Sequence, residues 1–227
     1  MEDVLEVYAR PYNVRRPLVC VDEKSKELHS EVTGREAWPA RPRQGDQQGT
    51  GKRARQDYEY KREGTSNIFM MVEPLAGKRR VRVTDQRTKC DFAEQLRIMV
   101  DEEYRDVEVV VLVVDNLNTH GPWVLYEHFP PEEARRIAER IEWHYTPEHG
   151  SWLNIAEIEL SVLQLQCLNR RVADKEMLIT ETAAWEQSRN DTYTLINWHF
   201  TTADARIKLR RLYPVQPKTL SILLVRY

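Results

Sequence analysis

The sequence predicts an α/β fold, and three observations support this prediction. The apolar run at residues 109–114 has no polar alternation and is typical of a strand buried on both faces. Shorter strand-like runs alternate with segments whose apolar residues recur at helical spacing. The chain has 227 residues, of which 41% are hydrophobic, and can bury a sizeable core. We therefore expect one large domain, or one domain with extensions.

The first third of the chain predicts a short helix, a strand and a loop. Apolar residues near the start predict the helix within residues 1–15, and the run at 18–22 predicts a strand that ends in Asp22. Residues 38–65 are rich in Pro, Gly, Gln and Arg and are typical of a mobile basic loop.

The middle of the chain predicts a hairpin, a helix and the central strand. Two strands at about 67–73 and 79–85 flank a turn whose Pro and Gly suit a hairpin connection. Apolar residues at helical spacing predict a helix over 91–103. The strand at 109–114 follows and ends at Asp115.

The last part of the chain predicts helices around one short strand. Pro130 and Pro131 begin a helix to about Arg140, with acids in its first turn and arginines later, as the helix dipole favours. A strand at 141–145 comes next, and Ser151 is expected to cap a long helix to about Arg170. Further helices are expected at 174–190 and 203–212.

Three acidic residues stand out in this arrangement. Asp22 and Asp115 end predicted strands, where open α/β sheets place their chemistry. At about 100° per residue, Glu157 falls inside the apolar arc of its helix and Glu159 falls outside it. A glutamate on an apolar face is costly unless it is paired or coordinates a metal. The alternatives are a strand-ending Asp-Asn turn for Asp115 and a pairing with Arg170 or Arg171 for Glu157.

Three neighbouring carboxylates have a definite chemistry. They raise one another's pKa, and the binding of divalent cations relieves the repulsion. Oxygen ligands that face phosphate favour Mg²⁺, with Mn²⁺ as a substitute. Two such ions about 4 Å apart can activate a water or a 3′-hydroxyl and stabilise the leaving oxygen of a phosphodiester. The sequence has no Gly-x-Ser-x-Gly, P-loop or dinucleotide glycine pattern that would indicate other chemistry.

Longer motifs around the acids carry a resemblance to a known family. Residues 19–23, 115–120 and 145–157, the last with the run Thr-Pro-Glu-His-Gly-Ser-Trp-Leu-Asn, resemble the three catalytic motifs of bacterial insertion-sequence transposases of the mariner superfamily. These proteins contain a DDE superfamily endonuclease domain. The resemblance covers nearly all of the chain, including 57–60, 62–65 and 206–214.

The resemblance implies an RNase H-like fold. We expect a mixed five-stranded sheet with helices on both faces and a helical C-terminal extension. The first three strands should be antiparallel, and the Asp115 strand should lie beside the first. Full-length members carry an N-terminal helix-turn-helix region, and we expect this chain to be the catalytic part without that region.

The same resemblance implies the reaction and its components. Asp22, Asp115 and Glu157 are the implied catalytic residues and the ligands of two Mg²⁺ ions, which Mn²⁺ can replace. The implied enzyme is a DNA endonuclease and strand transferase that cleaves transposon ends and joins them to target DNA. Its implied partners are double-stranded DNA and a second transposase chain, in a homodimer or a paired complex with full-length transposase. The alternative is a catalytically idle fragment that binds and modulates full-length transposase.

Several other polar residues are candidates for supporting roles. Asn116 and His120 follow Asp115 and could contact a scissile phosphate or order a metal-bound water, or they could close the turn and lie at the surface. His149 is a similar candidate near Glu157. Trp152 is expected to pack at the helix start more than to stack on a base. Glu23 points to the opposite strand face from Asp22 and is expected to form a salt bridge.

Contacts with the DNA backbone have to come from local basic patches, because the net charge is −2. Such contacts position DNA without reading its sequence. The last helix, with Arg206, Lys208, Arg210 and Arg211, is one candidate region, although a solvated surface is the favoured interpretation there. The candidates in the basic loop are Arg41, Arg43, Lys52, Arg53, Arg55 and Arg62.

Composition also limits the location of the protein. The three cysteines have no zinc or disulfide spacing and fit buried thiols in a reducing compartment. No stretch approaches about 18 apolar residues, and the acidic start is unlike a secretory signal. We expect a soluble protein of the bacterial cytoplasm, nucleoid-associated when bound to DNA, with no membrane partner. We divide the chain into a linker helix at 1–16, a catalytic domain at 17–200 and a basic helix and tail at 201–227.

Overall fold

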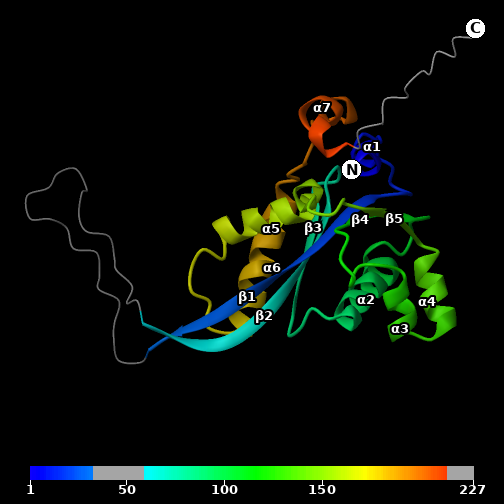
Figure 1. Ribbon diagram of the computed structural model, residues 1–227. Helices are drawn as coiled ribbons and strands as arrows, with labels where there is room; N and C mark the ends of the chain where they lie inside the picture. The colour runs from blue at the N-terminus through cyan, green and yellow to red at the C-terminus, as the bar shows by residue number, and fades with distance from the viewer. Residues whose placement is uncertain (33–58, 214–227) are drawn as a thin grey trace, which may run out of the picture.

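The computed structural model describes residues 1–32 and 59–213, and a mixed five-stranded sheet forms its centre (Figure 1). The strand order is β3-β2-β1-β4-β5. The first three strands pair antiparallel, whereas β1–β4 and β4–β5 are parallel, which confirms the predicted RNase H-like sheet. The strands are β1 Leu18–Glu31, β2 Tyr60–Glu73, β3 Lys78–Thr84, β4 Val110–Val114 and β5 Ile141–Tyr145.

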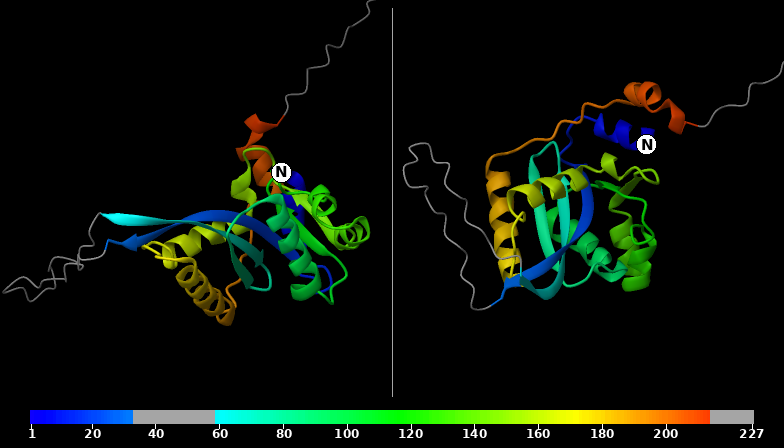
Figure 2. Two further views of the ribbon diagram at one scale, coloured as in Figure 1. Left: turned by 90° about the horizontal axis from the view of Figure 1, so that it is seen from below. Right: turned by 60° about the vertical axis from the view of Figure 1, so that its left-hand side comes forward.

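Helices cover both faces of the sheet, as predicted (Figure 2). Apolar residues of α1, α5, α6 and α7 form one core, whereas those of α2, α3 and α4 form the other. The apolar run of β4 divides between them, because Val111 and Val113 face the first core and Leu112 and Val114 face the second. The helices are α1 Glu2–Tyr8, α2 Lys89–Ile98, α3 Trp123–His128, α4 Pro131–Ala138, α5 Ile155–Gln166, α6 Lys175–Asp191 and α7 Thr202–Lys208.

The first strand is longer than predicted. The sequence places its end at Asp22, but β1 continues to Glu31 because its polar second half pairs with β2. The partner β4 accompanies β1 only from Leu18 to Cys20. Asp22 therefore lies within β1, just beyond the point where β4 stops pairing with it.

The predicted basic loop at 38–65 is wrong at its end, because residues 60–65 belong to β2. Arg62 consequently lies in a strand, where its guanidinium forms an ion pair with Glu27 of β1. The loop residues up to 58 lie outside the described residues, and so do Arg41, Arg43, Lys52, Arg53 and Arg55.

The predicted start and end of the long helix are also corrected. Ser151–Leu153 forms a separate 3₁₀ turn, and Asn154 is the residue that caps α5. The Asn154 side chain accepts a hydrogen bond from the Ala156 backbone N–H, which occupies a donor that the helix start leaves open. The helix ends at Gln166, before the predicted Arg170.

The described residues also bear on membrane segments, cysteines and the division of the chain. No helix in the described part of the chain is long and apolar enough to span a bilayer. All three cysteines are free, but Cys90 is exposed near the start of α2, so the prediction of buried thiols is wrong there. The division into a linker helix, a catalytic domain and a tail stays a prediction, although α1 contributes Leu5 and Tyr8 to the same core as α5.

Candidate active site

Asp22 and Asp115 are brought together by two parallel strands. The pairing of β1 with β4 ends at Cys20 and Val113, and each aspartate is two residues further along its strand direction. Residues two apart in a strand share a face. Cys20 and Val113 both belong to the core that α5 covers, so both aspartates start from the α5 side of the sheet.

Glu157 reaches the same region because the start of α5 is fixed to β1. Asn154 is fully buried, and its Nδ2 donates a hydrogen bond of 2.9 Å to the backbone oxygen of Val21, the neighbour of Asp22. The Tyr8 hydroxyl donates to the Leu153 backbone oxygen at 2.6 Å, which ties α1 to the same turn. Glu157 occupies the first turn of α5, three residues after its cap.

Glu157 does not serve as a capping side chain in this position. The Asn154 backbone N–H, which a capping-box glutamate would bond, donates to Ser151 at 2.7 Å instead. The alternative pairing with Arg170 is also absent, because Arg170 forms an ion pair with Glu181. The Glu157 Oε2 is buried and has no hydrogen-bond partner within residues 1–32 and 59–213. Its carboxylate is therefore available to a ligand.

The three acids interact electrostatically. Burial raises the pKa of Asp22 from 3.8 to about 7, against a lowering hydrogen bond from the Glu23 backbone N–H. The charges of Asp115, Glu23 and Glu157 are smaller contributions to the same rise in pKa. Burial and like charge both disfavour ionised Asp22, and a bound cation would relieve the penalty.

His120 lies between two of the carboxylates. Its Nδ1 contacts Asp115 Oδ1, and its Nε2 lies 3.0 Å from Glu23 Oε2. The imidazole is only 1% exposed and packs on Phe92 of α2 at a centroid distance of 4.3 Å. Burial lowers the pKa of His120, but the contacts with Asp115 and Glu23 outweigh it and raise the pKa to about 9. The prediction of a Glu23 salt bridge is confirmed, and the alternative of a surface His120 is wrong.

Glu159 is buried, although the helical arc predicts that it lies outside the apolar face. Arg79 of β3 donates to both of its carboxylate oxygens, at 3.0 and 3.2 Å, and Arg189 of α6 donates to Oε1 at 2.9 Å. The Arg79 side chain has no exposed surface. The prediction fails because the partners of Glu159 come from β3 and α6, and the apolar arc of α5 contains no information about these two elements.

The other candidates near the acids are more exposed. Asn116 is exposed, and the His149 side chain is 93% exposed. Trp152 packs at the helix start as expected, since its ring stacks on Trp198 at a centroid distance of 6.5 Å, and 44% of the residue remains exposed.

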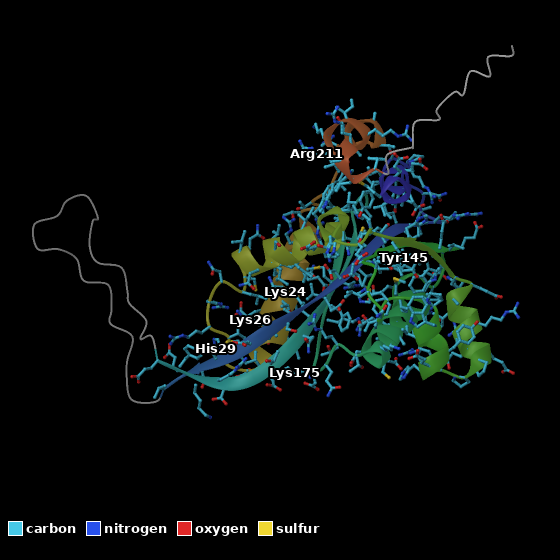
Figure 3. The ribbon with its side chains drawn as sticks, viewed as in Figure 1. Lys24, Lys26, His29, Tyr145, Lys175 and Arg211 are labelled. Atoms are coloured by element: carbon cyan, nitrogen blue, oxygen red, sulfur yellow. The ribbon has the colours of Figure 1, made fainter. Side chains whose placement is uncertain are left out.

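Basic residues that the sequence interpretation overlooked follow Asp22 along β1. Figure 3 shows Lys24, Lys26 and His29 in succession along this strand. The two lysines share the face of Asp22, a signal that strand alternation alone provides. Lys26 donates to the backbone oxygen of Leu168 at 2.9 Å, whereas Lys24 is exposed. The basic residues of α7 lie beside α1 instead, where Arg206 forms an ion pair with Glu2 at 2.7 Å.

A family comparison identifies the domain that contains these acids. The family described as DDE superfamily endonuclease matches residues 17–179, which include all three acids. The chain belongs to this family. No curated protein sequence matches the chain.

Two solved structures are similar to this DDE endonuclease domain in fold. The Mos1 strand transfer complex has a TM-score of 0.50 at 13% identity, covering 84% of this chain and 53% of the Mos1 chain. The Mos1 transposase paired-end complex with left transposon end has a TM-score of 0.51 at 15% identity, covering 91% of this chain and 59% of that chain. The chain thus spans little more than half the length of the Mos1 chains.

The three acids fit a hard divalent cation in donor type and charge. The unpartnered Glu157 Oε2 and the raised pKa of Asp22 are consistent with such a ligand. Within the described ranges, no three His, Cys, Asp or Glu side chains stand close enough to hold a metal ion. The acids are therefore neighbours with suitable chemistry, but they do not stand at ligand spacing in this structure.

Proposed function

We propose that this domain is the catalytic domain of a transposase that cleaves DNA at transposon ends and joins the ends to target DNA. The observation that carries the proposal is the convergence of Asp22 of β1, Asp115 directly after β4 and Glu157 of α5 inside a DDE endonuclease domain. The paired-end complex of Mos1 transposase with a transposon end supports double-stranded DNA as the substrate and a paired assembly as the active form.

In this proposal Asp22, Asp115 and Glu157 would hold two Mg²⁺ ions, with Mn²⁺ as a substitute. The ions would supply an activated water or 3′-hydroxyl and stabilise the leaving oxygen of the phosphodiester. The chain's own contribution is to bring three carboxylates together in a partly buried place, with α5 held against β1 by Asn154. Because no side-chain nucleophile is required, the acids need only to bind and orient.

Residues around the acids would position the DNA. Lys24 is exposed on the Asp22 face of β1, and Asn116 is exposed beside Asp115, so both are suited to contact phosphate oxygens. His149 offers a further contact near the start of α5. We also propose that a basic set of residues contacts the phosphate backbone of the DNA. The set consists of Arg41, Arg43, Lys52, Arg53, Arg55 and Arg62.

The experiment is a nicking and joining assay with the full chain. Supercoiled plasmid and a pre-cleaved transposon-end duplex are incubated with Mn²⁺ or Mg²⁺, and the products are nicked circles and plasmid joined to the duplex. We expect both products from the unmodified protein and only background from Asp115→Asn. Products that survive Asp115→Asn, or no products with either metal, would contradict the proposal and favour an idle fragment that modulates another transposase.

A further inference from the structure

His120 is a buried polar side chain that contacts Asp115 and whose role the proposed reaction leaves open. It lies in the turn after β4, where its backbone N–H donates to Leu117 at 2.9 Å. Both ring nitrogens face carboxylates, Asp115 on one side and Glu23 on the other. Because the ring is 1% exposed, it has no free nitrogen for a DNA phosphate or a water.

The three residues come from different parts of the fold. Glu23 points to the face of β1 opposite to Asp22, toward the core that contains Phe92. The Phe92 ring packs on the imidazole, so the ring plane is restrained by packing as well as by its two polar contacts. The Glu23 side chain is 6% exposed, and its negative charge is compensated by the same imidazole. His120 is thus held on three sides.

This arrangement acts on only one oxygen of Asp115. The contact with His120 involves Oδ1, which leaves Oδ2 for another ligand. Carboxylates that ligate metals are commonly held by a hydrogen bond to one oxygen, and removal of such a partner typically weakens metal binding about 10–100-fold. A loop residue such as Asp115 has no strand pairing of its own to fix its side chain.

We propose that His120 is a positioning residue that orients the Asp115 carboxylate for a divalent cation, with Glu23 as the residue that anchors His120. The inference rests on the proposed function, because Asp115 is a metal ligand only there. It assigns His120 no contact with DNA. It also gives Glu23 a role on the far side of the sheet from the three acids.

A second histidine provides a matched control. His144 of β5 also lies between two carboxylates, with Nδ1 2.8 Å from Asp3 Oδ2 and Nε2 2.9 Å from Glu142 Oε1. Its side chain is 9% exposed. Neither of its partners is one of the three acids. The loss of either imidazole removes contacts with two carboxylates, but only His120 adjoins Asp115.

The test is Mn²⁺ affinity, measured by isothermal titration calorimetry or by the electron paramagnetic resonance signal of free Mn²⁺. His120→Asn keeps a donor near the Nδ1 position, whereas His120→Gln keeps one near Nε2. We expect His120→Ala and His120→Gln to bind Mn²⁺ about 10–100-fold more weakly than the unmodified chain. His120→Asn should recover most of the affinity, and His144→Ala should bind as the unmodified chain does.

The outcomes separate this inference from the proposed function. Equal Mn²⁺ affinity of His120→Ala, His144→Ala and the unmodified chain would overturn the role of His120 and leave the proposed function intact. An equal loss in His120→Asn and His120→Gln would overturn it as well, because the effect would not depend on the Asp115 contact. An unmodified chain that binds no Mn²⁺ would overturn the proposed function, and the inference with it.

Discussion

Glu157 and Glu159 lie two residues apart on α5 and have opposite environments. Glu159 is buried and accepts hydrogen bonds from Arg79 and Arg189, so its charge is compensated. Glu157 is only partly buried, and its Oε2 has no partner among the residues that the structure describes. The comparison shows that glutamates on the same helix can have two different roles. A paired glutamate holds elements together, whereas an unpaired one beside other acids weakens the fold and is available to a cation.

Removal of Glu159 should have the largest effect on stability. Glu159→Ala leaves Arg79 buried without its carboxylate, and breaking a buried ion pair costs about 3–5 kcal/mol. The free energy of unfolding from denaturant titration measures the loss. Glu157→Ala, on the same helix, is the control and should cost far less. Equal losses of unfolding free energy in the two variants would contradict the view that only Glu159 stabilises the fold.

Asn154 should come next, because it fixes the helix that carries both glutamates. Asn154→Ala removes the α5 cap and leaves the Val21 oxygen without its side-chain donor, so we expect a loss of about 2 kcal/mol. Asp174→Ala is the matched control, since Asp174 caps α6 from an exposed position and should cost about 1 kcal/mol or less. Chemical denaturation of the two variants gives the comparison. Equal costs would show that the bond to Val21 contributes nothing.

These elements also show what sequence can predict about this fold. The strand that ends at Asp115 is predictable because β4 is buried on both faces and carries no polar residue. The arc of α5 predicts an inward Glu157, but it cannot predict Glu159, whose partners come from β3 and α6. The second half of β1 is missed because its residues are mostly polar and only the pairing with β2 makes them a strand. Likewise, no local pattern places Glu23 against His120, which follows the other strand.

Asp22 extends the comparison to a second uncompensated acid. Burial and neighbouring carboxylates raise its pKa to about 7 in the folded chain. Because this value exceeds the unfolded one, the stability that protonated Asp22 contributes is present below about pH 4 and is lost as pH rises through 7. Asp22→Asn has no such charge, but its amide remains partly buried, so we expect a gain near 1 kcal/mol at pH 8, or about 2–4 °C.

Melting temperatures at pH 4, 6 and 8 test this prediction. The difference between Asp22→Asn and the unmodified chain should grow with pH. A difference in melting temperature that does not change with pH would mean that Asp22 titrates as an ordinary carboxylate. A lower melting temperature of Asp22→Asn than of the unmodified chain at pH 8 would contradict the predicted gain in stability.

Glu157→Gln should have the smallest effect on stability. Its carboxylate has no ion pair in the described residues, so replacement by an amide of the same shape should change the free energy of unfolding by no more than about 0.5 kcal/mol. Denaturant titration of Glu157→Gln, in parallel with Glu159→Ala, measures this change in the free energy of unfolding. A loss of several kcal/mol would reveal a structural role for Glu157.

The most direct measurement of the central claim is the rate of Mn²⁺-dependent plasmid nicking by Glu157→Gln. If Glu157 is a ligand together with Asp22 and Asp115, nicking should fall at least about a hundredfold, equivalent to about 2.7 kcal/mol of transition-state stabilisation, in a protein that unfolds at the same denaturant concentration as the unmodified chain. Nicking at the unmodified rate by this folded variant would contradict the assignment of the three acids as one catalytic site.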